Sequence, residues 1–272
     1  MKHKSFLFKD TIVNYQVEGC GEETIVLLHG FMNTLDVWAT YVFMYMKKVR
    51  VVTVDLLGHG ETGILAETHT METQAEMVKE LLDFLNINSC VIAGHSMGGY
   101  VALAFCDIYP QYVKGLSLVN SHAMEDDQTA KKNRLKTCDI VRENRASFIV
   151  NFIPDLFAKE SLKALSSEIK DIQDSAICMK TEGIVAAQKG MMDRPSRLNV
   201  LINANYPILF IIGKKDPRII LESIFAQATL PFHSEILLLD NVGHMAHIEA
   251  DMIVKDRLYS FVSSCYKFLI KQ

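Results

Sequence analysis

Short apolar runs alternate with longer segments of helical period along most of the chain. Eight of the short runs are rich in β-branched residues and predict strands. These strands are expected at Ser5–Lys9, Thr11–Val17, Thr24–His29, Val49–Asp55, Ser89–Gly94, Val113–Asn120, Pro207–Gly213 and Ser234–Asp240. From the third run onward the apolar residues are continuous, which indicates parallel strands buried on both faces. The first two runs are too close together for a helical crossover, so they predict an antiparallel hairpin at one edge of the sheet.

Apolar residues between these runs recur at helical spacing. In segments 71–85 and 254–265 they fall three and four residues apart, as one buried helical face demands. Pro110 is expected to end a helix that begins near Met97. The alternation of strands and helices predicts an α/β fold with a mostly parallel, eight-stranded sheet and helices on both faces.

One segment, residues 123–200, breaks this alternation. It contains charged helical stretches and an apolar cluster at Phe148–Phe157 that Pro154 interrupts, but no clear strand. We expect a helical cap here, inserted between the sixth and seventh strands of a core made of residues 1–122 and 201–272. Such a cap would cover the carboxyl edge of the sheet, where ligands bind in open α/β folds.

The overall charge and apolar content exclude several classes of protein. The 272 residues include 28 Lys and Arg against 32 Asp and Glu, a net charge of −4, and 49% are hydrophobic. The chain therefore lacks the positive excess of a general nucleic-acid binder. No apolar run approaches the roughly 18 to 20 residues of a membrane span, and the basic N-terminus lacks a secretory apolar region of about 7 to 15 residues. We expect a soluble, cytoplasmic protein, and its oligomeric state stays open.

The six cysteines show no CxxC pair and no histidine partners at zinc spacing. Cys90, Cys106 and Cys265 lie in apolar-periodic segments, where cysteine behaves as a small hydrophobe. We therefore expect free thiols and no metal site.

The strongest chemical signal is Gly94-His95-Ser96-Met97-Gly98-Gly99, between an apolar strand and a helical run. This is the G-x-S-x-G pattern in its strand–turn–helix context. The turn is so tight that Gly94 and Gly98 must lack side chains. It would lift the Ser96 hydroxyl clear of the backbone at the positive end of a helix, so we expect Ser96 to be a nucleophile.

A serine nucleophile needs a base, usually a histidine oriented by a carboxylate. His244 follows the last predicted strand, in a loop that can reach the Ser96 turn, and is the expected base, with His247 as its alternative. Asp216 lies just beyond another predicted buried strand and is the expected acid. The order Ser96, Asp216, His244 is that of hydrolases with a nucleophile elbow. His95 is expected to pack in the core.

The oxyanion hole is expected to follow the third strand. Gly30 permits a sharp turn that points the Phe31 amide inward, where it would pair with the Met97 amide. Two such donors would bind the negative oxygen of a tetrahedral intermediate.

Together these motifs resemble the α/β-hydrolase fold superfamily, and specifically its cap-bearing, small-molecule serine esterase branch. The resemblance extends from about Thr11 to the C-terminus. It rests on His29–Phe31, Trp38, Asp55–Thr62, Gly94–Gly99, Gly213–Pro217 and Gly243-His244. Leu57 and Thr62 stand where proline and serine are commoner in the family, in a loop that is structural there.

Two positions weigh against particular relatives. Ser96, rather than an aspartate, argues against the chemistry of haloalkane dehalogenases and soluble epoxide hydrolases. Tyr100 stands where the menaquinone-pathway synthases of this fold usually have arginine.

These observations predict a serine hydrolase that cleaves a carboxylic ester or related small acyl substrate through an acyl-enzyme, without metal or organic cofactor. Three alternatives stay open: a cofactor-free C–C bond hydrolase or lyase, a perhydrolase on the same triad, and a non-catalytic ligand-binding member of the fold. The residues that could line a substrate pocket are Met32, Trp38, His95, Phe148, Phe152 and Met245.

Overall fold

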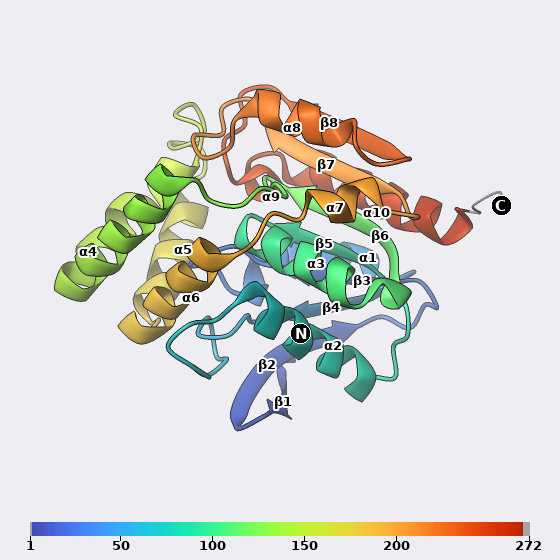
Figure 1. Cartoon of the computed structure of the whole chain (residues 1–272), viewed down its shortest axis with the longest axis horizontal. Coiled ribbons are helices and arrows are strands. Elements are labelled where there is room, and N and C mark those ends of the chain that lie inside the picture. The colour runs from blue at the N-terminus through green and yellow to red at the C-terminus, as the bar shows by residue number, and fades with distance from the viewer. Residues whose placement is uncertain (1, 269–272) are drawn as a thin grey trace.

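A computed structural model describes residues 2–268 and contains all eight predicted strands. They form one sheet in the order β1-β2-β4-β3-β5-β6-β7-β8 (Figure 1). The strands are β1 (Lys4–Phe8), β2 (Thr11–Glu18), β3 (Thr24–Leu28), β4 (Arg50–Val54), β5 (Cys90–His95), β6 (Val113–Val119), β7 (Ile208–Gly213) and β8 (Ser234–Leu239).

The pairing of the strands agrees with the prediction. β1 and β2 form the antiparallel edge hairpin, and β2 pairs antiparallel with β4. All other neighbouring strands pair in parallel. Every residue of β3, β5 and β7 is buried, as continuous apolar runs in the centre of a parallel sheet require.

Helices cover both faces of the sheet (Figure 1). One apolar layer includes residues of α2 (Met71–Phe84), α3 (Met97–Ile108) and α8 (Leu221–Ala228). The opposite layer includes residues of α1 (Ala39–Tyr45) and α10 (Asp251–Lys267). The other short helical turns outside the insertion are η1 (Leu35–Trp38), η2 (Pro110–Tyr112) and α9 (Ala246–Glu249). The fold is therefore the predicted α/β sheet with helices on both sides.

A helical insertion connects β6 to β7 and lies to one side of the sheet (Figure 1). It consists of α4 (Gln128–Phe152), η3 (Pro154–Leu156), α5 (Ser166–Ile177), α6 (Thr181–Asp193) and α7 (Leu198–Ile202). The Asp127 side chain accepts a hydrogen bond from Ala130 N and caps α4. Asn144 interrupts α4 with non-helical backbone angles. The division at residues 123 and 200, and the role of this insertion as a cap, stay predictions.

Two glycines of α6 allow the insertion to approach the core backbone. A Cβ atom at Gly190 would lie 1.8 Å from the carbonyl oxygen of His69, and one at Gly183 would lie 2.6 Å from that of Gly58. His69 N also donates a hydrogen bond of 3.0 Å to Ala186 O of α6. Helix and loop are therefore in backbone contact, which fixes the position of the insertion.

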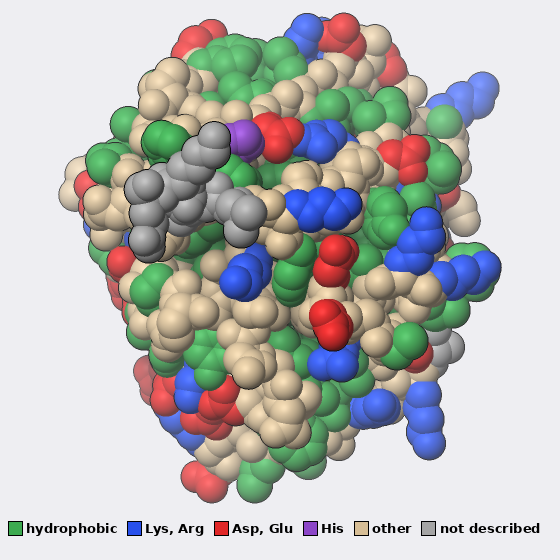
Figure 2. Space-filling model, turned by 90° about the vertical axis from the view of Figure 1, so that its right-hand side faces the viewer, with side chains coloured by type: hydrophobic (Ala, Val, Ile, Leu, Met, Phe, Trp, Pro, Cys, Tyr) green, Lys and Arg blue, Asp and Glu red, His purple; other side chains and the backbone are tan. Residues whose placement is uncertain are grey.

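The six cysteines are free thiols, with Cys90, Cys106, Cys138 and Cys265 buried. Among residues 2–268, no helix is both long and apolar enough to cross a membrane. On the face shown in Figure 2, acidic and basic side chains are interspersed, in keeping with the small net charge.

Candidate active site

Ser96 occupies a strained turn between β5 and α3. Its backbone angles are φ 51° and ψ −114°, a conformation that residues with a side chain rarely adopt. The turn is closed by glycines on both sides: a Cβ atom at Gly94 would lie 2.2 Å from Gly98 O, and one at Gly98 would lie 2.5 Å from Leu28 O. Ser96 N is held by Val119 O at 3.0 Å. This strain holds the Ser96 side chain clear of the sheet, where it stays partly accessible.

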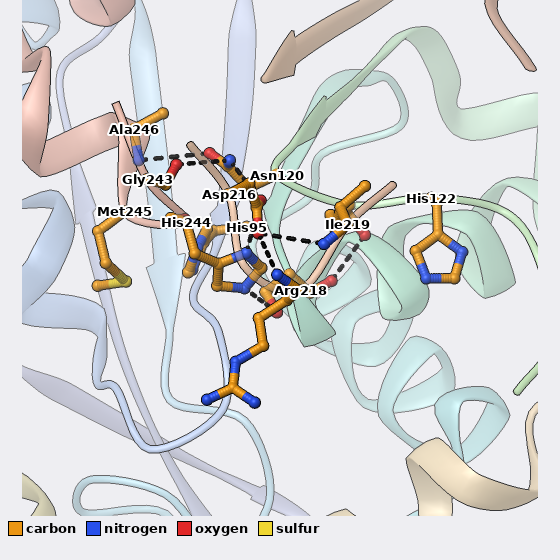
Figure 3. Close-up of polar contacts among 12 residues, drawn as sticks. His95, Asn120, His122, Asp216, Arg218, Ile219, Gly243, His244, Met245 and Ala246 are labelled. Carbon is orange, nitrogen blue, oxygen red and sulfur yellow. Dashed lines mark hydrogen bonds and ion pairs between the residues drawn. The ribbon is translucent and has the colours of Figure 1, made fainter. Parts of the chain in front are cut away.

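The three residues predicted as a triad form one hydrogen-bonded chain. His244 Nε2 lies 2.9 Å from Ser96 Oγ, and His244 Nδ1 lies 2.8 Å from Asp216 Oδ2. With Nδ1 carrying the proton, it donates to Asp216 and leaves Nε2 to accept from the serine hydroxyl. Figure 3 shows Asp216 and His244 in this arrangement. Three segments far apart in sequence thus bring a serine hydroxyl, an imidazole and a carboxylate into contact.

Asp216 is ionised by its surroundings despite its burial. Its Oδ1 accepts hydrogen bonds from Arg218 N at 2.8 Å and Ile219 N at 3.2 Å, and its Oδ2 accepts from Asn120 Nδ2 at 2.8 Å. Burial acts to raise the pKa of this carboxyl, but the interaction with His244 and these hydrogen bonds outweigh burial and lower the pKa below its usual value. Asp216 therefore presents a fixed negative charge to His244.

Asn120 is a positioning residue that the sequence did not reveal. It lies at the carboxyl end of β6 with φ 45°, and is fully buried. Besides Asp216, its Nδ2 contacts Gly243 O at 3.1 Å, and its Oδ1 accepts from Ala246 N at 3.3 Å (Figure 3). Asn120 thus joins the loop of the acid to the loop of the base.

Glu249 is a second such residue. One carboxylate oxygen accepts from Gly243 N at 2.9 Å and Met245 N at 3.2 Å, on both sides of His244. The other accepts from Ala158 N at 2.9 Å and Ser161 Oγ at 2.8 Å, both in the insertion. The helical insertion and the histidine loop are therefore tied by one side chain. The sequence signal was only a glutamate in a short helix, which carries no information about these long-range partners.

His247, the alternative base, is not positioned to act as the general base for Ser96. It is buried between the rings of Trp38, 4.8 Å away, and His95, 4.3 Å away. Burial lowers its pKa to about 3. His95 is a packed core histidine as expected, and its Nε2 donates to the carbonyl oxygen of His244 at 2.9 Å. His95 thus supports the backbone of the base.

Two other histidines, His69 and His122, lie in loops. His69 is fully buried, and burial lowers the pKa of each to about 4. His122 contacts Tyr100 Oη through Nε2 at 3.3 Å.

Two backbone amides from different segments are free: Phe31 N in the loop after β3, and Met97 N at the start of α3. Within residues 2–268, neither Phe31 N nor Met97 N donates a hydrogen bond to a protein group. His29 fixes this loop: Nδ1 donates to Gly30 O at 2.8 Å, and Nε2 accepts from Leu56 N at 2.9 Å. A Cβ atom at Gly30 would lie 2.4 Å from His95 Nδ1, so this close approach requires glycine. Both amides stay available to a ligand oxygen.

The six candidate pocket residues fall into different surroundings. Phe152 packs edge-on against Phe31 at 5.9 Å and stacks on Phe148 at 5.1 Å, so these α4 aromatics lie beside the loop that follows β3. Trp38 packs in the core against Tyr41 and His247, and Met245 is fully buried. Met32 lines a cavity of about 530 Å³ that neither Ser96 nor His244 lines. In the described part of the chain, no three His, Cys, Asp or Glu side chains are placed to hold a metal ion.

Comparison with known proteins agrees with this fold. The family model of the alpha/beta hydrolase fold matches residues 23–251. A solved thermophilic esterase from Thermogutta terrifontis is 26% identical, with a TM-score of 0.91, over 97% of this chain and 99% of its own. The enol-lactonase from Burkholderia xenovorans LB400 is 20% identical, with a TM-score of 0.88, over 96% of this chain and all of its own, a likeness that shows the fold alone.

Curated relatives carry several different activities. A dihydrolipoyllysine-residue acetyltransferase component of the acetoin cleaving system from Pseudomonas putida is 28% identical over 91% of this chain, which spans only 65% of that relative. A putative 2-succinyl-6-hydroxy-2,4-cyclohexadiene-1-carboxylate synthase from Bacillus subtilis is 24% identical over 89% of this chain and 91% of its own. The family match covers most of the residues that build the sheet and the Ser96 site, and the chain belongs to the alpha/beta hydrolase fold family.

Proposed function

We propose that this protein is a serine hydrolase that cleaves a carboxylic ester or related small acyl substrate through an acyl-enzyme. The observation that carries the proposal is the hydrogen-bonded chain from Ser96 Oγ through His244 to Asp216, at 2.9 and 2.8 Å. These distances are those of a nucleophile with its general base and orienting acid. The 26% identity to the Thermogutta terrifontis esterase over nearly the whole of both chains supports the same class.

In the first half of the reaction, Ser96 Oγ attacks the substrate carbonyl carbon while His244 Nε2 takes the hydroxyl proton. His244 is then positively charged, and the ionised Asp216 stabilises it through the Nδ1 hydrogen bond. The carbonyl oxygen becomes negative and is bound by the Phe31 and Met97 amides. Removal of one such donor typically lowers the rate by about 100- to 1000-fold.

In the second half, His244 returns the proton to the leaving alcohol, and the acyl group stays on Ser96. Water then attacks the acyl-enzyme with His244 again as base, and Ser96 is regenerated. His95 and Asn120 keep the loops of His244 and Asp216 in place during both halves, through their hydrogen bonds to His244 O and to the Asp216 side chain. The protein's own residues therefore supply every proton transfer.

The surroundings of the oxyanion loop favour a compact acyl group. Phe152 packs against Phe31, and the Arg218 guanidinium lies 4.9 Å from the centre of the Phe152 ring. These side chains would limit the space next to Ser96 and therefore the size of the acyl group that fits there. The insertion carries Phe152, so we assign to it the role of a cap.

Turnover of p-nitrophenyl esters of increasing acyl length tests this proposal. Wild type should hydrolyse short esters, and Ser96→Ala should lower kcat by about a million-fold, as loss of the nucleophile does in other triad hydrolases. Vinylogous diketones, and acetate with hydrogen peroxide, should be poorer substrates than esters. Faster turnover of either would replace the ester proposal by C–C bond cleavage or perhydrolysis.

A further inference from the structure

Phe152 of the insertion spans the end of β5 that carries Ser96. The centre of its ring lies 5.9 Å from that of Phe31, in the loop after β3, and 4.9 Å from the guanidinium of Arg218, in the loop after β7. In the sheet, β5 lies between β3 and β7. A side chain that contacts the loops after both of these strands therefore lies over the carboxyl end of β5, where the Ser96 turn begins.

Arg218 is attached to the acid of the proposed triad. Its backbone N–H donates to Asp216 Oδ1 at 2.8 Å, and the N–H of the next residue, the buried Ile219, donates to the same oxygen at 3.2 Å. The guanidinium lies over the Phe152 ring, a favourable contact between a cation and the face of an aromatic ring. Backbone and guanidinium are therefore both held in place, although the residue is exposed.

The positive charge of Arg218 has no partner in the part of the chain that the structure describes. No carboxylate of residues 2–268 lies within ion-pair distance of the guanidinium, and its N–H groups donate no hydrogen bond to these residues. Figure 3 shows the side chain extending away from the Asp216–His244 pair, with no dashed line at its end. A guanidinium that packs on a ring keeps its N–H edge available, and this edge matches a carboxylate with two parallel hydrogen bonds.

We propose, on the basis of the hydrolysis proposed at Ser96, that the substrate is the half-ester of a short dicarboxylic acid, and that Arg218 binds its free carboxylate. The ester carbonyl lies between Ser96 and the Phe31 amide. The short chain passes under the Phe152 ring, and the carboxylate meets the guanidinium on the β7 side. Hydrolysis consumes water and releases the alcohol, the dicarboxylate and a proton. Arg218 is thus a specificity-determining residue that takes no part in the proton transfers.

Matched pairs of esters test this recognition. Monoethyl succinate, monoethyl glutarate and monoethyl adipate each carry a carboxylate, and their carboxamide analogues have the same shape without the charge. Proton release at pH 7.5 gives kcat/KM for each ester. For at least one chain length, wild type should prefer the carboxylate by about 10-fold, because a charge-assisted pair of hydrogen bonds is lost with the carboxamide. Equal kcat/KM within every pair would overturn the proposal and leave ester hydrolysis standing.

Arg218→Met removes the charge and keeps an apolar side chain next to Phe152. It should lower the ratio of kcat/KM between carboxylate and carboxamide by about 10-fold, and this ratio does not depend on the amount of active enzyme. Lys215→Met is the matched control, because Lys215 lies on the same loop, is exposed and, unlike Lys214, pairs with no carboxylate of residues 2–268. It should keep the wild-type ratio. An unchanged ratio in Arg218→Met, or an equal loss in Lys215→Met, would contradict the assignment to Arg218.

Binding to Ser96→Ala separates this recognition from the proposed reaction. This variant lacks the hydroxyl that would form the acyl-enzyme, so calorimetric titration measures the affinity for each half-ester without turnover. Ser96→Ala with Arg218→Met should bind the preferred half-ester about 10-fold more weakly than Ser96→Ala does. If this difference is found while wild type hydrolyses none of the esters, the proposed hydrolysis fails and the carboxylate site stands. Equal affinity of the two proteins for every half-ester would overturn the site, whatever the turnover.

Discussion

Asn120 donates a hydrogen bond of 2.8 Å to Asp216, and this contact links the end of β6 to the acid of the proposed triad. The same amide group bonds to Gly243 O, next to His244. Asn120 therefore fixes the position of Asp216 relative to the loop that carries His244. Its hydrogen bond also lowers the pKa of the Asp216 carboxyl. It touches neither Ser96 nor His244 in this structure, so its role is to position.

Replacing Asn120 by glycine keeps the backbone at φ 45° feasible while removing the amide group. Loss of this donor should raise the pKa of Asp216, make the carboxylate a stronger partner for charged His244, and move the acid limb of the kcat/KM profile to higher pH. We expect kcat to fall by about 10-fold, the effect of losing one charge-assisted hydrogen bond of about 1.5 kcal/mol.

The matched control is Asn241→Gly. Asn241 also has a positive φ, of 56°, but is exposed. This variant should leave both kcat and the pH profile unchanged. A purely structural role for Asn120 would lower the amount of active enzyme in Asn120→Gly without moving the acid limb.

Glu249→Gln should loosen the tie between the histidine loop and the insertion. The carboxylate accepts from Gly243, Met245, Ala158 and Ser161, whereas an amide turns one of its two acceptors into a donor. At least one backbone N–H then faces another N–H. Leaving a buried donor unpaired lowers the free energy of unfolding by about 1–3 kcal/mol.

Urea unfolding measures this loss, and ester turnover should fall alongside it because His244 is less firmly held. Glu222→Gln, at an exposed site on α8, is the comparison and should change neither quantity. Wild-type stability in Glu249→Gln would show that the four bonds do not restrain the loop.

Gly190→Ala separates helix propensity from backbone contact. Propensity alone would make alanine better than glycine in α6 by about 1 kcal/mol. The added Cβ atom, however, would lie 1.8 Å from His69 O, so helix and loop must separate. We expect a net loss of about 1–3 kcal/mol in the free energy of unfolding, as for other overpacked sites.

Differential scanning calorimetry decides the sign, with Glu182→Ala on the exposed side of α6 as the control. A rise in Tm for Gly190→Ala would contradict the tight contact. The contact itself could not be read from the sequence, because a glycine in a helix has no visible partner until the fold is known.

Acid should destabilise the protein through its buried histidines. The pKa of His247 is lowered to about 3 by burial, well below the usual 6.5. The unfolded chain therefore binds a proton at this residue between these two values while the folded chain does not. The contribution of His247 to the free energy of unfolding is therefore fully present above pH 6.5. It falls as the pH drops towards 3, by up to about 1.4 kcal/mol per pH unit.

His247→Phe should flatten that slope, because a phenyl ring can pack between Trp38 and His95 without titrating. The free energy of unfolding in urea at pH 7.5, 6 and 5 provides the measurement. His233→Gln changes a partly exposed histidine and should leave the slope as it is in wild type. An undiminished slope in His247→Phe would mean that this ring is solvated in the folded state.

The sheet could be predicted from sequence because its signal is local. Continuous apolar runs such as Ile208–Gly213 are typical of a strand that is buried on both faces. The strict turn chemistry of Gly94–Gly98 predicts a nucleophile at Ser96. Asn120 and Glu249 could not be found this way, because their partners lie far away in the chain. Asn120 did end a predicted strand, and Asp216 lay just beyond another, so a polar residue at a carboxyl edge was the available signal.

The insertion was harder to predict in detail. Helix α4 is kinked at Asn144, where the backbone angles are not helical, and its apolar residues do not lie on one face. Its positions are set by contacts with the core rather than by local propensity. The existence of helices there was predictable from composition, whereas their boundaries were not.

The most direct test of the central claim is the intact mass of the protein after reaction with a fluorophosphonate. An activated Ser96 should give one adduct per chain, mapped by peptide sequencing to Ser96, and Ser96→Ala should give none. Ser264→Ala, which removes an exposed hydroxyl on α10, should label like wild type. Labelling that persists in Ser96→Ala, or its absence from folded wild type, would contradict the proposed role of Ser96 as the nucleophile.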